Sequence, residues 1–173
     1  DGKIDIEPVK RPITSSLIPI IRPPQPLLSV KLSNKDYENF DLALNQAKKW
    51  RWKSVKLISQ KIENEDARSI LNWIRYYSGA DDLSFTDYRN FLNDNKHWPL
   101  IESIKIRAEN KISFSDDHDQ LINYFKNQNP LTGWGKIYYG NSLLKKGNED
   151  LAELLIKEGY INGSFSRREQ KVI

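Results

Sequence analysis

The stretch from Pro130 to Ile156 constrains the fold of this chain most, because it predicts two helices joined by one tight turn. Thr132 is expected to cap the first helix, since its hydroxyl can accept a hydrogen bond from a backbone N–H. Gly147 is expected to end that helix in the left-handed conformation, and Asn148 to cap the second. The side chains expected to be buried are Trp134, Ile137, Tyr138 and Leu144 on the first helix and Leu151, Ala152, Leu154 and Leu155 on the second. An isolated pair cannot bury such faces, so neighbouring helices are expected to stack on it.

Apolar residues at helical spacing continue over the chain from Ser33 onward. A helix is expected after the turn at Trp50-Arg51-Trp52. The other helices before residue 130 are expected to start at Ser33 or Asn34, Glu65, Ser84, Pro99 and Ser115, and a ninth is expected after Ser164. The side chains expected to face inward include Ala67, Ile70, Leu71, Ile74 and Tyr77 on the third helix and Leu100, Ile104, Ala108 and Ile112 on the fifth.

No alternating run of Val, Ile and Thr is present, so no sheet is expected. Nine helices with short connections predict an all-α fold for residues 33–173, in which antiparallel helical hairpins stack into a superhelix, a tetratricopeptide-like solenoid. A weak internal echo agrees with this prediction. Lys48-Lys49-Trp50-Arg51 parallels Lys145-Lys146-Gly147-Asn148 at an offset of 97 residues, near three units of about 32–34.

Residues 1–32 form a separate segment that holds six of the eight prolines. Proline removes a backbone donor and fixes its own φ, so neither a helix nor a central strand is expected there. One interpretation is a flexible leader. The other is an extended segment that lies along the body or a partner, because its apolar residues are too many for a solvated linker. Those residues are Leu17, Ile18, Ile20, Ile21, Leu27 and Leu28.

Composition excludes several classes of protein. Cysteine is absent from the sequence, which excludes a disulfide framework and a thiolate metal site. No run of 18 apolar residues occurs, so no membrane span is expected. Half of the net charge of +4 belongs to residues 1–32, and residues 33–173 carry 22 Lys and Arg against 20 Asp and Glu. No basic stripe accompanies this excess, so a nucleic-acid partner is not expected.

The two histidines are candidates for chemical roles, His97 as a proton shuttle and His118 as a metal ligand. His97 precedes Trp98 and Pro99 at a predicted helix junction, where a turn residue is expected rather than a proton shuttle. His118 lies among Asp116, Asp117 and Asp119, which resembles a metal site. Aspartates in an acidic first helical turn are the simpler explanation, so no metal is expected.

Other candidate motifs also favour structural roles. Glu158-Gly159-Tyr160 lies at a predicted helix end, with Gly159 as a C-cap, and not in a catalytic loop. Gly133-x-Gly135 follows no predicted strand and is therefore no dinucleotide loop. The five tryptophans could stack on sugar rings, although packing between helices is expected for most of them. They are Trp50, Trp52, Trp73, Trp98 and Trp134.

Several stretches of the chain resemble the N-terminal superhelical region of the soluble lytic murein transglycosylases. The first is Phe91-Leu92-Asn93-Asp94-Asn95-Lys96-His97-Trp98-Pro99, where Lys96 replaces the family's usual proline, and Ile106-Arg107-Ala108-Glu109 follows it. Pro130-Leu131-Thr132-Gly133-Trp134-Gly135 is similar to a Pro-Leu-Thr-Gly segment of that family, and Gly163-Ser164-Phe165-Ser166 to a stretch before a charged helix. The matches run in the right order from about Phe40 to the end of the sequence.

The resemblance implies a helical platform in the bacterial periplasm with peptidoglycan glycan strands or a protein as partner. Members of the family cleave the MurNAc–GlcNAc bond to a 1,6-anhydro product without metal or cofactor, in a lysozyme-like domain with one catalytic glutamate. The Glu-Ser, Gly-Leu-Met-Gln and Ala-Tyr-Asn-Ala-Gly motifs of that domain do not occur in this sequence. No catalytic, cofactor-binding or metal-binding residue is therefore assigned. The alternatives are a non-enzymatic tetratricopeptide-like scaffold that binds a protein, and a relative that has lost catalysis.

Overall fold

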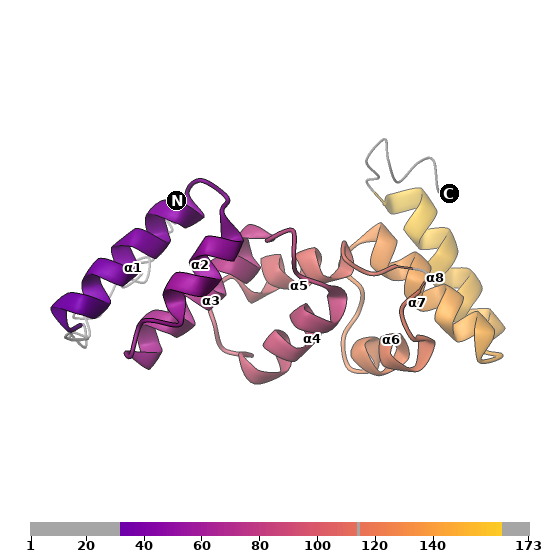
Figure 1. Cartoon of the computed structure of the whole chain (residues 1–173). Helices are drawn as coiled ribbons and strands as arrows, with labels where there is room; N and C mark the ends of the chain where they lie inside the picture. Colours follow the sequence, from indigo (N-terminus) through magenta and orange to yellow (C-terminus); the bar gives the residue numbers. More distant parts are fainter. Residues whose placement is uncertain (1–31, 114, 164–173) are drawn as a thin grey trace, which may run out of the picture. The chain divides into compact units, whose positions relative to one another are not determined.

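The computed structural model describes residues 32–113 and 115–163, which contain eight α-helices and no strand. Figure 1 shows the helices in chain order. They are α1 (Asn34–Ala47), α2 (Trp52–Ser59), α3 (Glu65–Ser78), α4 (Phe85–Asp94), α5 (Ile101–Glu109), α6 (His118–Phe125), α7 (Gly133–Lys145) and α8 (Glu149–Asn162). The all-α prediction is confirmed over these residues. The proline-rich residues 1–31 and the predicted helix after Ser164 lie outside them.

Three of the predicted caps are confirmed by hydrogen bonds, whereas Asn148 precedes α8 without a capping bond from its side chain. The side chains of Ser33, Ser84 and Thr132 each accept from a backbone N–H three residues on, and Ser84 forms a full capping box. The cap predicted at Ser115 is wrong, because α6 starts two residues later and Asp117 caps it. An aspartate carboxylate is as effective an N-cap as a serine hydroxyl, so the local sequence does not distinguish Ser115 from Asp117 as the cap.

Three helices end in the same turn. Gly79 after α3 and Gly147 after α7 have φ values of 81° and 82°, and Trp50 after α1 has a φ of 57°. In each turn, the next residue's N–H donates to the carbonyl five residues before it, at 3.2, 3.0 and 3.1 Å respectively. This is the bonding of a Schellman motif, in which glycine is the usual left-handed residue. The left-handed end predicted at Gly147 is confirmed, and the offset of 97 residues connects two turns of the same kind.

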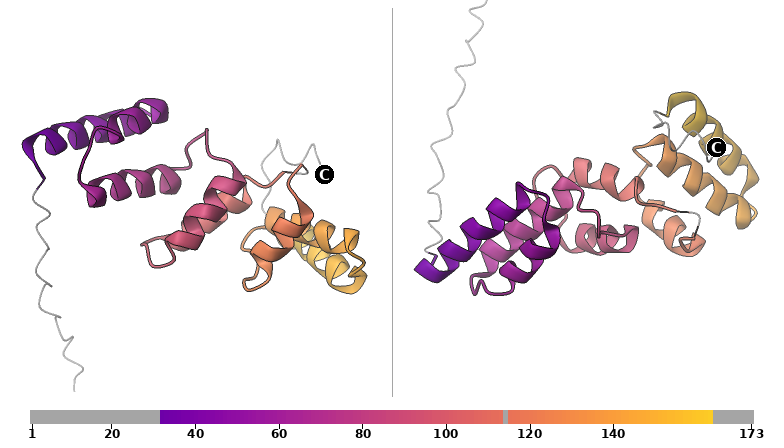
Figure 2. Two further views of the ribbon diagram at one scale, coloured as in Figure 1. Left: turned by 60° about the horizontal axis from the view of Figure 1, so that its bottom comes forward. Right: turned by 45° about the horizontal axis from the view of Figure 1, so that its top comes forward.

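Helices α7 and α8 form an antiparallel hairpin and lie side by side in all views (Figures 1 and 2). Their contact uses small residues, because a β-carbon at Gly159 would stand 2.8 Å from the carbonyl oxygen of Gly133. A β-carbon at Gly140 would likewise stand 2.9 Å from the carbonyl oxygen of Ala152. The prediction that Gly159 ends a helix is therefore wrong. It lies inside α8, where the absence of a side chain lets the two backbones approach.

Several leucines of this hairpin lie outside the contact, although the sequence predicts that they are buried. Leu144 was expected to be buried but is 49 % exposed, and its neighbour Leu143 is buried in its place. Leu151 and Leu154 on α8 are also exposed, whereas Ala152 is fully buried. Gly140 lies against Ile156 and Gly159 against Ile137, so these isoleucines and not the predicted leucines fill the contact.

Two further inward predictions are wrong, and both concern ends or edges of helices. Ile70 lies on the exposed side of α3. Leu100 precedes α5 with a φ of 57° and is exposed, because α5 starts at Ile101, two residues after the predicted start at Pro99. The predicted inward residues Ile104, Ala108 and Ile112 are buried.

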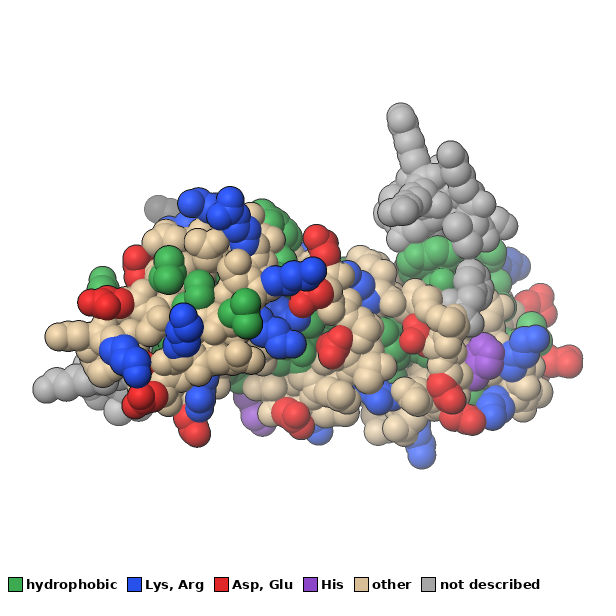
Figure 3. All heavy atoms as spheres, in the orientation of Figure 1, with side chains coloured by type: hydrophobic (Ala, Val, Ile, Leu, Met, Phe, Trp, Pro, Cys, Tyr) green, Lys and Arg blue, Asp and Glu red, His purple; other side chains and the backbone are tan. Residues whose placement is uncertain are grey.

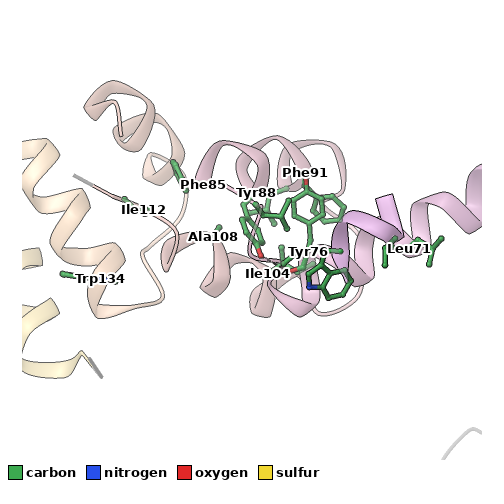
Figure 4. Close-up of a cluster of buried hydrophobic side chains, with 14 of the residues drawn as sticks. Leu71, Tyr76, Phe85, Tyr88, Phe91, Ile104, Ala108, Ile112 and Trp134 are labelled. Atoms are coloured by element: carbon green, nitrogen blue, oxygen red, sulfur yellow. Dashed lines mark hydrogen bonds between the residues drawn. The ribbon is translucent and has the colours of Figure 1, made fainter. Parts of the chain in front are cut away.

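Several buried rings gather where α3, α4 and α5 meet (Figure 4). The rings of Tyr76 and Phe91 stack with centroids 4.1 Å apart, and Tyr88 meets Tyr76 edge to face at 5.2 Å. The Tyr88 hydroxyl donates to the Tyr76 carbonyl at 3.2 Å. Burial raises the pKa of Tyr88 to about 12, so this hydroxyl stays protonated and keeps its bond at neutral pH.

Candidate functional site

The most deeply placed carboxyl group in the described residues is that of Glu109, the last residue of α5. Glu109 is 2 % exposed. It accepts a hydrogen bond from Leu131 N–H at 2.8 Å and from Thr132 N–H at 2.7 Å. The Thr132 hydroxyl donates to the same carboxylate at 2.7 Å. One carboxylate thus holds the chain segment that leads into α7.

The hydrogen bonds of Glu109 continue into the first turn of α7. The Thr132 oxygen that donates to Glu109 also accepts from Gly135 N–H at 2.8 Å, which is the cap of this helix. A β-carbon at Gly135 would overlap the Oε2 atom of Glu109. Gly133 and Gly135 therefore belong to a helix start that surrounds a buried carboxylate.

Glu109 has an altered acidity but no access to a substrate. Burial raises the pKa of its carboxyl group, and the hydrogen bonds from Leu131 and Thr132 oppose that shift. A raised carboxyl pKa is a feature of catalytic acids. A group 2 % exposed and enclosed by a helix start cannot reach a glycosidic oxygen, so its role is to position α7. No local pattern in the sequence marks this role, because the hydrogen-bond partners of Glu109 lie more than 20 residues further along the chain.

Asp36 has the same role at the other end of the described chain. It is buried in the first turn of α1 and accepts from Glu63 N–H at 2.8 Å and from Asn64 N–H at 3.1 Å. Asn64 is itself the cap of α3. Two buried carboxylates thus hold the segments that lead into α3 and α7, each by accepting from successive backbone amides.

The two histidines lie apart and form no common site. His97 is exposed in the connection between α4 and α5. The Nδ1 atom of His118 is 3.0 Å from the Ser142 hydroxyl oxygen. Ser142 uses its proton to donate to the Tyr138 carbonyl at 2.8 Å, so His118 is the donor of their shared bond.

The aspartates around His118 each have another partner. Asp117 caps α6, Asp116 accepts from Ser113 N–H at 2.7 Å, and Asp119 pairs with Lys146 at 2.7 Å. Across residues 32–113 and 115–163, no group of three or more potential ligands could hold a metal ion. Glu158 of the Glu158-Gly159-Tyr160 stretch forms an ion pair with Lys136 at 2.8 Å.

Four of the five tryptophans take part in packing. Trp52 and Trp134 are buried. The half-buried Trp73 stacks between Tyr77 at 5.5 Å and Trp98 at 6.2 Å, and its Nε1–H donates to the Pro99 carbonyl at 3.0 Å. These rings cover one another, which leaves little open face for a sugar.

Trp50 is the exception, with 61 % of the residue exposed. It stands at the edge of a cavity of about 360 Å³ between the start of α2 and the connection from α3 to α4. The cavity is lined by Trp50, Arg51, Trp52, Lys53, Ser54, Asp81 and Asp82. An exposed ring beside hydrogen-bonding donors and acceptors makes this the candidate binding site.

Charge on the molecular surface gives no second candidate on the face drawn in Figure 3. Basic and acidic side chains are interspersed there and do not gather into one basic stripe. This distribution agrees with the near balance of charge in residues 33–173. None of the described helices is both long enough and apolar enough to cross a bilayer.

Comparisons with known proteins add no relative. No protein-family model matches the chain, and neither a curated protein nor a solved structure resembles it at a significant level.

Proposed function

We propose that this chain is the helical platform of a peptidoglycan lytic transglycosylase in the bacterial periplasm. In this proposal its hairpins stack as a superhelix and position glycan strands, while a separate catalytic domain cleaves the MurNAc–GlcNAc bond. The observation that carries the proposal is the contact at Glu109. Two stretches that resemble the family, Ile106–Glu109 and Pro130–Gly135, are joined there by hydrogen bonds to one carboxylate.

The third resembling stretch supports the same interpretation. Phe91 stacks on Tyr76 of α3, and Trp98 and Pro99 both contact Trp73 of α3. The residues that resemble the family are thus the ones that join α3, α4, α5 and α7. Such residues specify a framework, and a resemblance carried by framework residues favours a shared platform more than a shared chemical site.

The described carboxyl groups favour a platform over an enzyme. Cleavage of a glycosidic bond needs an accessible carboxyl group with a raised pKa that can protonate the leaving oxygen. Burial raises the pKa of Glu109, but its carboxyl group is enclosed. A glycan bound to this surface would be held but not cut.

The first prediction is that the purified chain releases no anhydro-muropeptides from murein sacculi. The reason is the lack of an accessible catalytic acid in the described helices. The measurement is chromatography of the soluble products after incubation, with an active lytic transglycosylase as the positive control. Release at enzyme-like rates that one carboxylate substitution in this chain abolishes would overturn the assignment.

A second candidate function is a non-enzymatic, tetratricopeptide-like scaffold that binds a protein. The observation in its favour is the exposure of large apolar residues on the last hairpin. They are Leu144, Leu151, Leu154 and Ile161. Apolar side chains gathered on an exposed helix pair are typical of a surface that contacts another protein segment. Retention on sacculi, or its absence, distinguishes the two candidates.

A further inference from the structure

The turn after α1 has an ordinary geometry, but it places an unusual residue, Trp50, at its left-handed position. The turns after α3 and α7 have the same hydrogen bonds and place glycine at the left-handed position. Trp50 occupies that position after α1 with a φ of 57°. A bulky side chain is disfavoured in this conformation because its β-carbon crowds the backbone, whereas glycine adopts it freely. The fold alone would therefore favour glycine at position 50.

Packing of the Trp50 side chain does not offset this disadvantage. The residue is 61 % exposed, so the ring removes little apolar surface from water. Within residues 32–113 and 115–163, its ring contact is with Trp52, edge to face, with centroids 5.7 Å apart. Trp52 is 4 % exposed and therefore fixed in the core. The buried Trp52 ring thus holds the exposed Trp50 ring in place. Exposed side chains held by rigid neighbours are typical of binding sites.

The chemistry of the neighbouring cavity indicates the ligand class. Arg51 and Lys53 supply donors, and Asp81 and Asp82 supply acceptors. Asp82 is held in place by Arg75, whose guanidinium donates to it at 2.6 Å. An anion in the cavity would meet two carboxylates, and a cation would meet two basic groups. Hydroxyl and amide groups, which donate and accept, fit this mixture best.

We propose that Trp50 and this cavity bind a neutral sugar ring of the glycan, an N-acetylglucosamine-type residue. The flat C–H face of a pyranose covers an aromatic ring, while its hydroxyl and acetamido groups reach the donors and acceptors beside it. A cavity of about 360 Å³ lies within the size range of small-ligand sites, roughly 300–1,000 Å³. This inference rests on the proposed function and assigns the glycan contact to one place on the platform.

The test uses the full chain and a β-1,4-linked hexamer of N-acetylglucosamine as the probe, titrated by calorimetry. Trp50→Gly is expected to weaken binding at least about tenfold, the effect of losing one well-placed contact. Its melting temperature is expected to stay unchanged or to rise by up to about 4 °C, because glycine suits the turn. Trp50→Phe keeps a ring and is expected to retain most of the affinity.

Tyr37→Ala is the matched control, because Tyr37 is an equally exposed aromatic residue of the same hairpin outside the cavity. Its affinity for the hexamer is expected to stay within about twofold of wild type. Unchanged binding by Trp50→Gly, or a melting temperature lowered by that change, would overturn the inference. A wild-type chain that shows no binding to the hexamer would also overturn it. If that chain still sediments with sacculi, the proposed function stands without this site; if it does not, both fail and a protein partner is favoured.

Discussion

Replacing Trp134 with alanine is expected to lower the free energy of unfolding by about 3–5 kcal/mol. Trp134 lies in the first turn of α7, is 8 % exposed, and packs against Tyr138 with ring centroids 5.1 Å apart. Its ring belongs to the buried cluster that includes Ile112 (Figure 4). Removing it would leave a cavity that the rigid start of α7 cannot close. Chemical denaturation followed by circular dichroism would measure the change.

The matched control for Trp134 is Leu144→Ala on the same helix. Both residues fall on one face by sequence periodicity, but Leu144 is 49 % exposed. Its truncation is expected to change the free energy of unfolding by less than about 1 kcal/mol. Equal losses for the two variants would contradict the different burial of the two side chains, and no loss for Trp134→Ala would contradict its packing role.

Replacing Glu109 with alanine is expected to lower the free energy of unfolding by about 3 kcal/mol. The change leaves the amides of Leu131 and Thr132 without their acceptor inside the protein, and each orphaned buried donor is unfavourable by about 1–3 kcal/mol. Glu102→Ala is the matched control, because Glu102 lies on α5 with an exposed side chain paired to Lys105. That variant is expected to lose less than about 0.5 kcal/mol.

The acidity of Glu109 gives the same test a pH signature. Its pKa is raised in the folded state, so the folded chain binds the proton more tightly than the unfolded chain. The stabilisation from this proton is complete below the unfolded pKa of about 4.3 and is lost as the pH rises through the folded pKa. Compared with Glu109→Gln, the wild-type chain should therefore gain stability between pH 7 and pH 4. A difference between the two chains that does not vary with pH would contradict the raised pKa.

Local chemistry explains which parts of the fold could be predicted from the sequence. Ser33, Ser84 and Thr132 were identified as caps because a hydroxyl before an apolar run has one common use. Gly147 was identified as a helix end for a similar reason, since few other residues adopt its φ. In both cases the information lies within four or five residues of the feature.

Features that depend on distant residues escaped prediction. Periodicity assigned Leu144 and Leu154 to buried faces, but Gly140 and Gly159 let α7 and α8 meet on a different side. The position of Glu109 against residues 131–132 likewise follows from the packing of α5 on α7's first turn, which no local pattern contains. Trp50 was assigned to a turn correctly, yet its exposure and its glycine-like φ appear only in the structure.

Sedimentation of the full chain with purified murein sacculi tests the central claim, binding of glycan strands by a helical platform, most directly. Residues 33–173 are nearly charge-balanced, so binding should depend on short-range contacts and not on long-range attraction to an anionic polymer. The account predicts that a similar fraction of the chain sediments with sacculi at about 0.01 M and about 1 M salt. Absence from the pellet at both salt concentrations would contradict the account and favour the protein-binding scaffold.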